Sequence, residues 1–195
     1  MVRTRAAAVV LALSTTVAAA GCNGGTDNAE PEPTPSPSAT ATPEAAQSPT
    51  PTQTATPEPP EAPEAADTRA AKKAFARYVV DTWGYALATN DPDPLVGLSP
   101  GKKPCVGCKE LAAELRDRKK QGWYVDFPGA EVKEATIDQR AGKSLAQMTV
   151  SVPESDTYND DGTYRSTNPG HPKGTFEVEM RFKKPKFELL SFRVS

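Results

Sequence analysis

The sequence predicts an α+β domain, in which helices pack on one face of a mainly antiparallel sheet, behind a disordered Pro/Thr-rich stalk. Apolar residues recur at helical spacing between residues 68 and 121, and the spacing changes to two after residue 122. The stretch before them, residues 23–67, contains eight acidic residues, no Lys or Arg and no aromatic residue. The core is therefore expected within residues 68–195, a length that suits one domain.

The N-terminus predicts a lipoprotein signal peptide over residues 1–21. Two arginines and a short apolar run precede small residues and then Cys22, and the run is too short and interrupted for a membrane-spanning helix. The segment Ala19-Ala20-Gly21-Cys22 resembles the bacterial lipobox, which implies that Cys22 is diacylated and becomes the mature N-terminus. The alternative is ordinary cleavage that leaves Cys22 unmodified. We expect an extracytoplasmic protein that is lipid-anchored to the cell membrane.

Residues 22–67 are expected to form the lipidated N-terminus and a disordered linker. Pro, Thr, Ala, Ser and Glu dominate this segment, and such a composition offers too little apolar surface to offset the entropy of ordering. The linker is interpreted as a spacer between membrane and domain. Threonine glycosylation and Pro-rich recognition are the alternatives.

Two helices are expected at the start of the domain. The first begins after Thr68, a typical N-cap residue, and runs to about Ala88. Its apolar stripe consists of residues four apart, namely Phe75, Val79, Trp83 and Leu87. The second helix covers residues 108–121, with basic side chains near its C-terminal end and Gly122 as the C-cap.

The remaining residues predict an antiparallel sheet with one solvated face. Alternating apolar residues mark five strands, at about 123–127, 130–139, 144–152, 175–183 and 187–194. Residues 154–172 are polar without an apolar alternation, and we interpret them as a long loop. Two helices followed by a meander of strands form a layered α+β fold.

Two short phrases and the order of elements resemble a known family. The phrases are Trp83-Gly84-Tyr85-Ala86 in the first helix and Cys105-Val106-Gly107-Cys108 at the start of the second, within a resemblance that covers about residues 70–195. The family consists of small actinobacterial lipoproteins of unknown function, with a cone-like domain similar to nuclear transport factor two and the polyketide cyclases. The resemblance implies that helices and a curved sheet enclose a pocket, and it transfers no catalytic residues.

Cys105 and Cys108 remain once Cys22 is lipidated. In an exported protein such a pair most simply forms a disulfide, which here would hold a loop to the start of the second helix. The alternative is thiol exchange, because Cys-x-x-Cys at a helix N-terminus is the redox spacing. A thioredoxin-like site, however, follows a strand, whereas a Pro/Gly/Lys loop precedes this pair. A zinc site needs two further ligands, and the one histidine, His171, lies far along the chain, so no metal is predicted.

Four aromatic residues are candidates to line the implied pocket. Trp83 and Tyr85 lie on the first helix, and Trp123 and Tyr124 begin the first strand. The alternative is that they belong to the core, where aromatic residues at helical or strand spacing usually lie. No set of catalytic residues and no cofactor site is predicted.

The function expected from these features is a non-enzymatic binding domain held at the membrane by its N-terminal lipid. Its partner would be a small apolar ligand or an envelope protein. The alternatives are an enzyme that uses the pocket or exchanges thiols at Cys105 and Cys108, and a structural or regulatory module of a cell-wall complex. The net charge of the domain is too small to indicate nucleic-acid binding.

Overall fold

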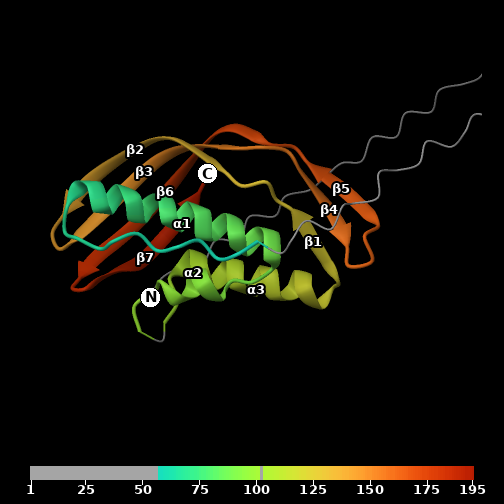
Figure 1. Cartoon of the computed structure of the whole chain (residues 1–195), viewed down its shortest axis with the longest axis horizontal. Helices are drawn as coiled ribbons and strands as arrows, with labels where there is room; N and C mark the ends of the chain where they lie inside the picture. Colours follow the sequence, from blue (N-terminus) through green and yellow to red (C-terminus); the bar gives the residue numbers. More distant parts are fainter. Residues whose placement is uncertain (1–56, 102) are drawn as a thin grey trace, which may run out of the picture. The chain divides into compact units, whose positions relative to one another are not determined.

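A computed structural model describes residues 57–195 with the exception of residue 102. The predicted signal peptide, Cys22 and the stalk up to residue 56 lie outside the described residues. The described chain forms an α+β domain in which helices pack against curved antiparallel sheets (Figure 1). The predicted fold class is confirmed.

The first helix, α1, spans Arg69–Thr89 and is capped as the sequence predicts. The side chain of Thr68 accepts a hydrogen bond of 3.1 Å from the backbone N–H of Ala71. The helix ends at Asn90, which has a left-handed conformation with φ 54°. The Asn90 side-chain amide donates to the carbonyl oxygen of Trp123 at 2.8 Å, so the end of α1 is tied to the first strand.

Two further helices follow. A short helix, α2, spans Asp93–Gly97, and α3 spans Val106–Lys120. The last turn of α3 carries three basic residues, where the helix dipole favours positive charge. Gly122 then takes a φ of 69°, the positive value that a glycine adopts at low cost.

The strands form two antiparallel sheets. The larger sheet has the order β2-β3-β6-β7, and its strands are β2 (Glu131–Arg140), β3 (Lys143–Val152), β6 (His171–Lys183) and β7 (Lys186–Val194). The smaller sheet has the order β1-β4-β5, and its strands are β1 (Trp123–Asp126), β4 (Ser155–Asn159) and β5 (Tyr164–Asn168).

The interpretation of residues 154–172 as a long loop is wrong. They contain the β4–β5 hairpin, and β6 begins at His171. The inward-facing residues of β4 are Ser155 and Thr157, which are buried but polar, so the segment shows no apolar alternation. Asn168 on β5 donates to the Thr157 hydroxyl at 3.1 Å and thereby satisfies this buried group.

The sheets separate where two chain segments cross closely. A Cβ atom on Gly170 would lie 2.5 Å from the carbonyl oxygen of Val152 and 2.7 Å from the backbone of Pro153. A side chain therefore does not fit at this crossing, and Pro153 lacks the N–H that would continue the ladder. The chain bends here between the larger and the smaller sheet.

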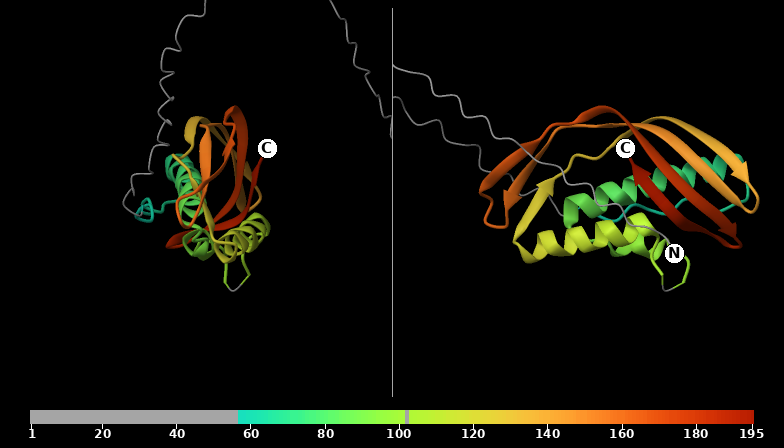
Figure 2. Two further views of the ribbon diagram at one scale, coloured as in Figure 1. Left: turned by 90° about the vertical axis from the view of Figure 1, so that its right-hand side faces the viewer. Right: turned by 180° about the vertical axis from the view of Figure 1, so that it is seen from behind.

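The core lies between the helices and the inner face of the larger sheet. Figure 2 shows the helices gathered on one side of the curved strands. The largest fully buried side chains come from both layers, and they include Val79, Val80, Leu115, Met148, Phe176, Val178, Met180 and Leu189. Burial of such side chains is the main favourable contribution to folding.

Residues 57–67 precede α1 and form neither helix nor strand. Ala65 packs against the core, and the carboxylate of Asp67 lies 2.6 Å from the ammonium group of Lys72, which is itself buried. The end of the predicted linker therefore contacts the domain.

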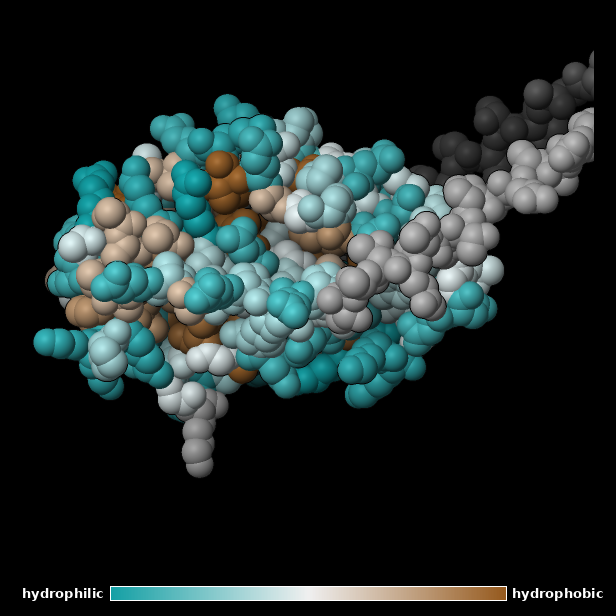
Figure 3. Space-filling model, viewed as in Figure 1, coloured by the Kyte–Doolittle hydropathy of each residue, from teal (hydrophilic) through white to brown (hydrophobic). Residues whose placement is uncertain are grey.

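Charged side chains cover much of the domain surface. The face in Figure 3 is mostly hydrophilic, with hydrophobic patches between the hydrophilic residues. On the outer face of the larger sheet the charges are paired, as in Lys143 with Glu179 at 3.1 Å and Arg193 with Glu177 at 4.0 Å. Among the described residues no helix is long and apolar enough to cross a membrane.

Candidate binding surface

Aromatic side chains fill the space between α1 and the larger sheet. The ring of Trp83 meets Phe127 edge-to-face at a centroid distance of 5.4 Å and Phe176 at 5.5 Å. Phe176 in turn stacks on Phe192 at 5.6 Å. A Cβ atom on Gly84 would lie 3.3 Å from the Phe127 ring, so the helix backbone and the ring are already in close contact. Trp83 is partly buried and therefore packs against the core.

The other three aromatic residues that were candidates for a pocket lie in different surroundings. Tyr85 is half-buried on α1. Trp123 contacts two guanidinium groups, those of Arg118 and Arg165, each 5.0 Å from its ring centroid. Tyr124 stacks on a tyrosine of β4. The four aromatic side chains thus have different immediate neighbours.

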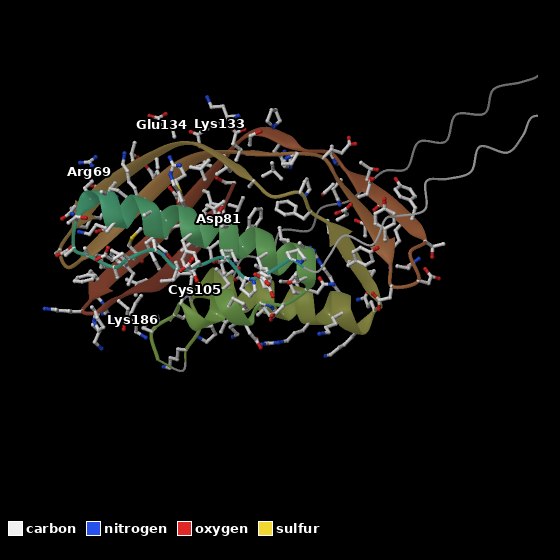
Figure 4. The ribbon with its side chains drawn as sticks, viewed as in Figure 1. Arg69, Asp81, Cys105, Lys133, Glu134 and Lys186 are labelled. Atoms are coloured by element: carbon white, nitrogen blue, oxygen red, sulfur yellow. A yellow bond between two sulfur atoms is a disulfide. The ribbon has the colours of Figure 1, made fainter. Side chains whose placement is uncertain are left out.

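Cys105 and Cys108 form a disulfide at the start of α3, with the two Cα atoms 5.0 Å apart. Both residues are buried, Cys105 to 4% exposure and Cys108 to 0%. The hydroxyl of Ser99 accepts a hydrogen bond of 3.0 Å from the backbone N–H of Cys105. Figure 4 shows Cys105 within the domain, between the helices. This placement fits the predicted structural disulfide, because an exchange reaction needs a sulfur atom that an attacking thiolate is able to reach.

The residue between the cysteines also has a packing role. A Cβ atom on Gly107 would lie 2.5 Å from the carbonyl oxygen of Phe192 on β7 and 3.2 Å from its ring. The start of α3 therefore approaches the backbone of β7 more closely than any residue with a side chain allows. The Cys-x-x-Cys segment therefore packs the start of α3 closely against β7.

Acidic side chains that could serve acid–base chemistry do not meet one another. Glu188 on β7 pairs with Arg181, and hydrogen bonding to this guanidinium lowers the pKa of the Glu188 carboxyl below its ordinary value. Asp81 lies on α1, where partial burial raises the pKa of its carboxyl against the opposing charge of Arg77 (Figure 4). Among the described residues no group of three or more His, Cys, Asp or Glu side chains is placed to hold a metal ion.

The smaller sheet carries a group of residues that we call the tyrosine face. Tyr124 on β1 stacks on Tyr158 on β4 at a centroid distance of 5.8 Å, and Tyr158 meets Tyr164 on β5 edge-to-face at 6.1 Å. Beside them lie two carboxylates, Asp126 on β1 and Asp156 on β4. Tyr164 is 58% exposed, which is high for an aromatic side chain.

The two carboxylates of the tyrosine face lie directly opposite each other. Asp126 and Asp156 are paired residues in the register of β1 with β4. Like charges in this position repel each other across the strands. They border a shallow depression of about 150 Å³, whose other lining residues are Pro128, Glu154 and Ser155.

The charges at this end of the domain are not neutralised by ion pairs. Five carboxylates lie on or beside the smaller sheet, and none forms an ion pair within the described part of the chain; they are Asp126, Glu154, Asp156, Asp160 and Asp161. Partial desolvation raises the pKa of the Tyr158 hydroxyl, and the neighbouring charges of Asp156 and Asp126 raise it further. The tyrosine face is therefore an electronegative aromatic surface.

Sequence reasoning identified Tyr124 but missed Asp156, Tyr158 and Tyr164. The reason is the assignment of their segment to a loop. A usable signal was present in the alternation of side chains. Asp156 and Tyr158 are two residues apart with the small residue Thr157 between them, and residues two apart lie on the same face of a strand.

Solved structures with a similar arrangement have low identity to this chain. A protein from Catenulispora acidiphila is 14% identical over 65% of this chain and 92% of its own, with a TM-score of 0.43. A protein of the NTF2-like family from Streptomyces avermitilis is 14% identical over 64% and 96%, with a TM-score of 0.42. Aln2 from another Streptomyces species is 11% identical over 61% and 89%, with a TM-score of 0.37.

The sequence itself matches one described family. No curated protein matches it. The model of a family of unknown function, DUF6318, matches residues 37–192, which includes almost all of the described domain and begins within the predicted stalk. The chain therefore belongs to the DUF6318 family of unknown function.

Proposed function

We propose that this chain is a lipid-anchored extracytoplasmic lipoprotein whose domain is a non-enzymatic binding module for an envelope protein. The observation that carries the proposal is the contrast between the two aromatic groups. The ring of Phe176 is fully buried and the partly buried Trp83 packs on it, whereas Tyr164 of the tyrosine face is 58% exposed. Binding at a surface is therefore better supported than enclosure of a small apolar ligand.

Anchoring is supported by the lipobox-like segment before Cys22 and by the resemblance to small actinobacterial lipoproteins. Two acyl chains on Cys22 would give stable attachment, where one chain is marginal. At about 3.1 Å per residue, the linker of residues 23–67 would reach at most roughly 140 Å, which is enough to hold the domain away from the membrane.

A non-enzymatic role is supported by the burial of the cysteine sulfur atoms and by the separation of the acidic side chains. The sulfur atoms of Cys105 and Cys108 are buried in a disulfide, and the acidic residues Asp81, Asp126 and Glu188 lie on three different elements. Geometry for paired acid–base chemistry requires two such groups within reach of one substrate atom.

The anchor is tested by fractionation of cells that express the full chain or its Cys22→Ala variant. We expect the parent in the membrane fraction, with an N-terminal peptide whose mass includes a diacylglycerol group. The variant is expected to lose this mass and to leave the membrane fraction. Equal membrane retention of both proteins, without added lipid mass, would reject the anchor.

The binding surface is tested with a photo-reactive amino acid placed at position 164 on the tyrosine face. A matched protein carries the same group at position 136 on the outer face of β2, where Thr136 is also exposed. We expect one discrete cross-linked envelope protein from position 164 and none from position 136. The same products from both positions, or none from either, would contradict binding at the tyrosine face.

A further inference from the structure

We infer that the tyrosine face, together with the free edge of β5, binds an extended polypeptide segment rich in lysine or arginine. This inference rests on the proposed function and specifies the chemistry of the partner. The partner segment would add to β5 as a further strand and place its cationic side chains over the tyrosine face.

The backbone of β5 offers an open edge. In the smaller sheet β5 is the outermost strand, paired with β4 on one side. Within the described residues its other side makes no backbone hydrogen bond, and all five of its residues are exposed. An extended peptide is able to pair with such an edge, where the backbone hydrogen bonds give affinity and alternate side chains give selectivity.

The side chains beside that edge select positive charge. Tyr164 and Thr167 of β5 are paired in register with Tyr158 and Asp156 of β4, and the Thr167 hydroxyl lies 2.5 Å from a carboxylate oxygen of Asp156. A strand added to β5 would therefore present every second side chain to these residues. A lysine or arginine there would approach both a carboxylate and the ring of Tyr164, and both interactions favour a cation.

The repulsion between Asp126 and Asp156 is the strongest indication of a cationic partner. The two residues are directly paired across β1 and β4, and neither forms an ion pair within the described residues. Other acidic side chains on strands, such as Glu177 and Glu179, have basic partners on neighbouring strands. A bound cation would convert this unfavourable pair into two favourable contacts. An anionic or purely apolar partner would leave the repulsion in place.

The depression beside the pair is suited to such a group. Ser155 lines it and is about nine-tenths buried, at 9% exposure. Glu154 lines the same depression from the exposed side. An ammonium or guanidinium group has several donors, which would satisfy the hydroxyl and the carboxylates together.

A second copy of this chain is the competing occupant. The β6–β7 hairpin carries three exposed lysines, Lys183, Lys184 and Lys186, at the end of the domain opposite β4 and β5 (Figure 4). Docking of this hairpin on the tyrosine face of another copy would form an open chain of molecules. The ammonium group of Lys183 already lies 3.9 Å from a carboxylate oxygen of Glu188 in its own chain. We therefore favour a different protein, and not a second copy, as the partner.

The test is calorimetric titration of the full-length protein with three short peptides. The first alternates lysine and threonine, the second replaces each lysine by glutamate, and the third is the lysine peptide with alternate backbone amides N-methylated. We expect the lysine peptide to bind with an affinity that falls as salt is raised. The glutamate peptide is expected not to bind, and the N-methylated peptide is expected to bind about tenfold more weakly, since strand pairing needs its amides.

The matched variants are Asp126→Asn/Asp156→Asn on the tyrosine face and Glu134→Gln/Asp138→Asn on β2. Both remove two negative charges, so a general electrostatic attraction would be weakened equally. We expect the first variant alone to lose about tenfold or more in affinity for the lysine peptide. Its melting temperature is expected not to fall, because the substitution removes a repulsion, and this measurement excludes misfolding as the cause.

Equal affinity of the two variants, or equal binding of the N-methylated and unmodified peptides, would overturn the inference. So would salt-sensitive self-association of the parent that Lys183→Glu/Lys186→Glu abolishes, because a second copy would then be the occupant. A cross-link from position 164 that survives while the lysine peptide fails to bind would retain the proposed function and reject its cationic partner.

Discussion

Replacement of Gly107 by alanine tests the contact on which the docking of α3 depends. The added Cβ would lie 2.5 Å from the carbonyl oxygen of Phe192 and 3.2 Å from two carbon atoms of its ring. The oxygen belongs to the backbone of β7, so no side-chain rotation relieves the overlap, and α3 must move away from the strand.

The expected size of the effect follows from two opposing contributions. Overpacking of a close contact costs about 1–3 kcal/mol. Alanine is favoured over glycine inside a helix by up to about 1 kcal/mol, and Gly107 lies within α3. We therefore expect Gly107→Ala to lower the free energy of unfolding by about 1–2 kcal/mol.

Gly97→Ala is the matched control. Gly97 is exposed at the end of α2, and nothing lies within 4 Å of the Cβ that alanine would add. Here the helix propensity acts alone, so the free energy of unfolding is expected to stay equal or to rise by less than about 1 kcal/mol. The same substitution is thus expected to destabilise the protein at position 107 and not at position 97.

The assay is urea-induced unfolding of the full chain, followed by tryptophan fluorescence and analysed by linear extrapolation. A lower midpoint for Gly107→Ala with an unchanged slope, and no such loss for Gly97→Ala, is the expected result. If Gly107→Ala proves as stable as the parent, the close approach of α3 to β7 is absent and the packing role of the Cys-x-x-Cys phrase is refuted.

Three further predictions concern the interior, the disulfide and acid stability. Trp83→Ala is expected to lower the free energy of unfolding by about 3 kcal/mol because it removes the ring contacts with Phe127 and Phe176, and a loss below that of Tyr85→Ala would contradict its packing against the core. The double replacement of Cys105 and Cys108 by serine should cost about 2 kcal/mol from loop entropy, and a mild dithiol should not reduce the buried bond in the native protein; rapid reduction, measured by thiol titration, would restore thiol exchange as a function. Glu188→Gln tests the ion pair with Arg181: because folding lowers the pKa of the Glu188 carboxyl, the pair stabilises the parent above the ordinary glutamate pKa and this stability is lost as the pH falls towards the lowered value. The melting temperatures of parent and variant should therefore differ at neutral pH and converge in acid, and a constant difference would argue against the pair.

Local signals in the sequence predicted several elements with close boundaries. The first helix begins after Thr68 and ends at Thr89, one residue from the expected end, because N-caps and helical periodicity are properties of neighbouring residues. The apolar alternation of β3, β6 and β7 likewise identified the larger sheet. In the smaller sheet β1 was predicted, whereas β4 and β5 were missed because the inward residues of β4, Ser155 and Thr157, are hydroxyl residues that carry no hydrophobic pattern.

The candidate binding surface could not be predicted in the same way. The stacking of Tyr124 on Tyr158, and the opposition of Asp126 and Asp156, depend on the register between strands that are about thirty residues apart in the chain. No local pattern specifies that register. The position of Trp83 depends in the same way on Phe127 and Phe176, which come from other elements.

Short-range signals in the sequence encode the α+β class, the first helix with its cap and the strands with an apolar face. The sequence also carries the prediction of a lipid anchor at Cys22, which rests on a linear motif. The tertiary structure decided that aromatic rings fill the interior, that the disulfide is buried, and that tyrosines and unpaired carboxylates share one face. These features arise from contacts between distant segments, and such contacts exist only once the chain has folded.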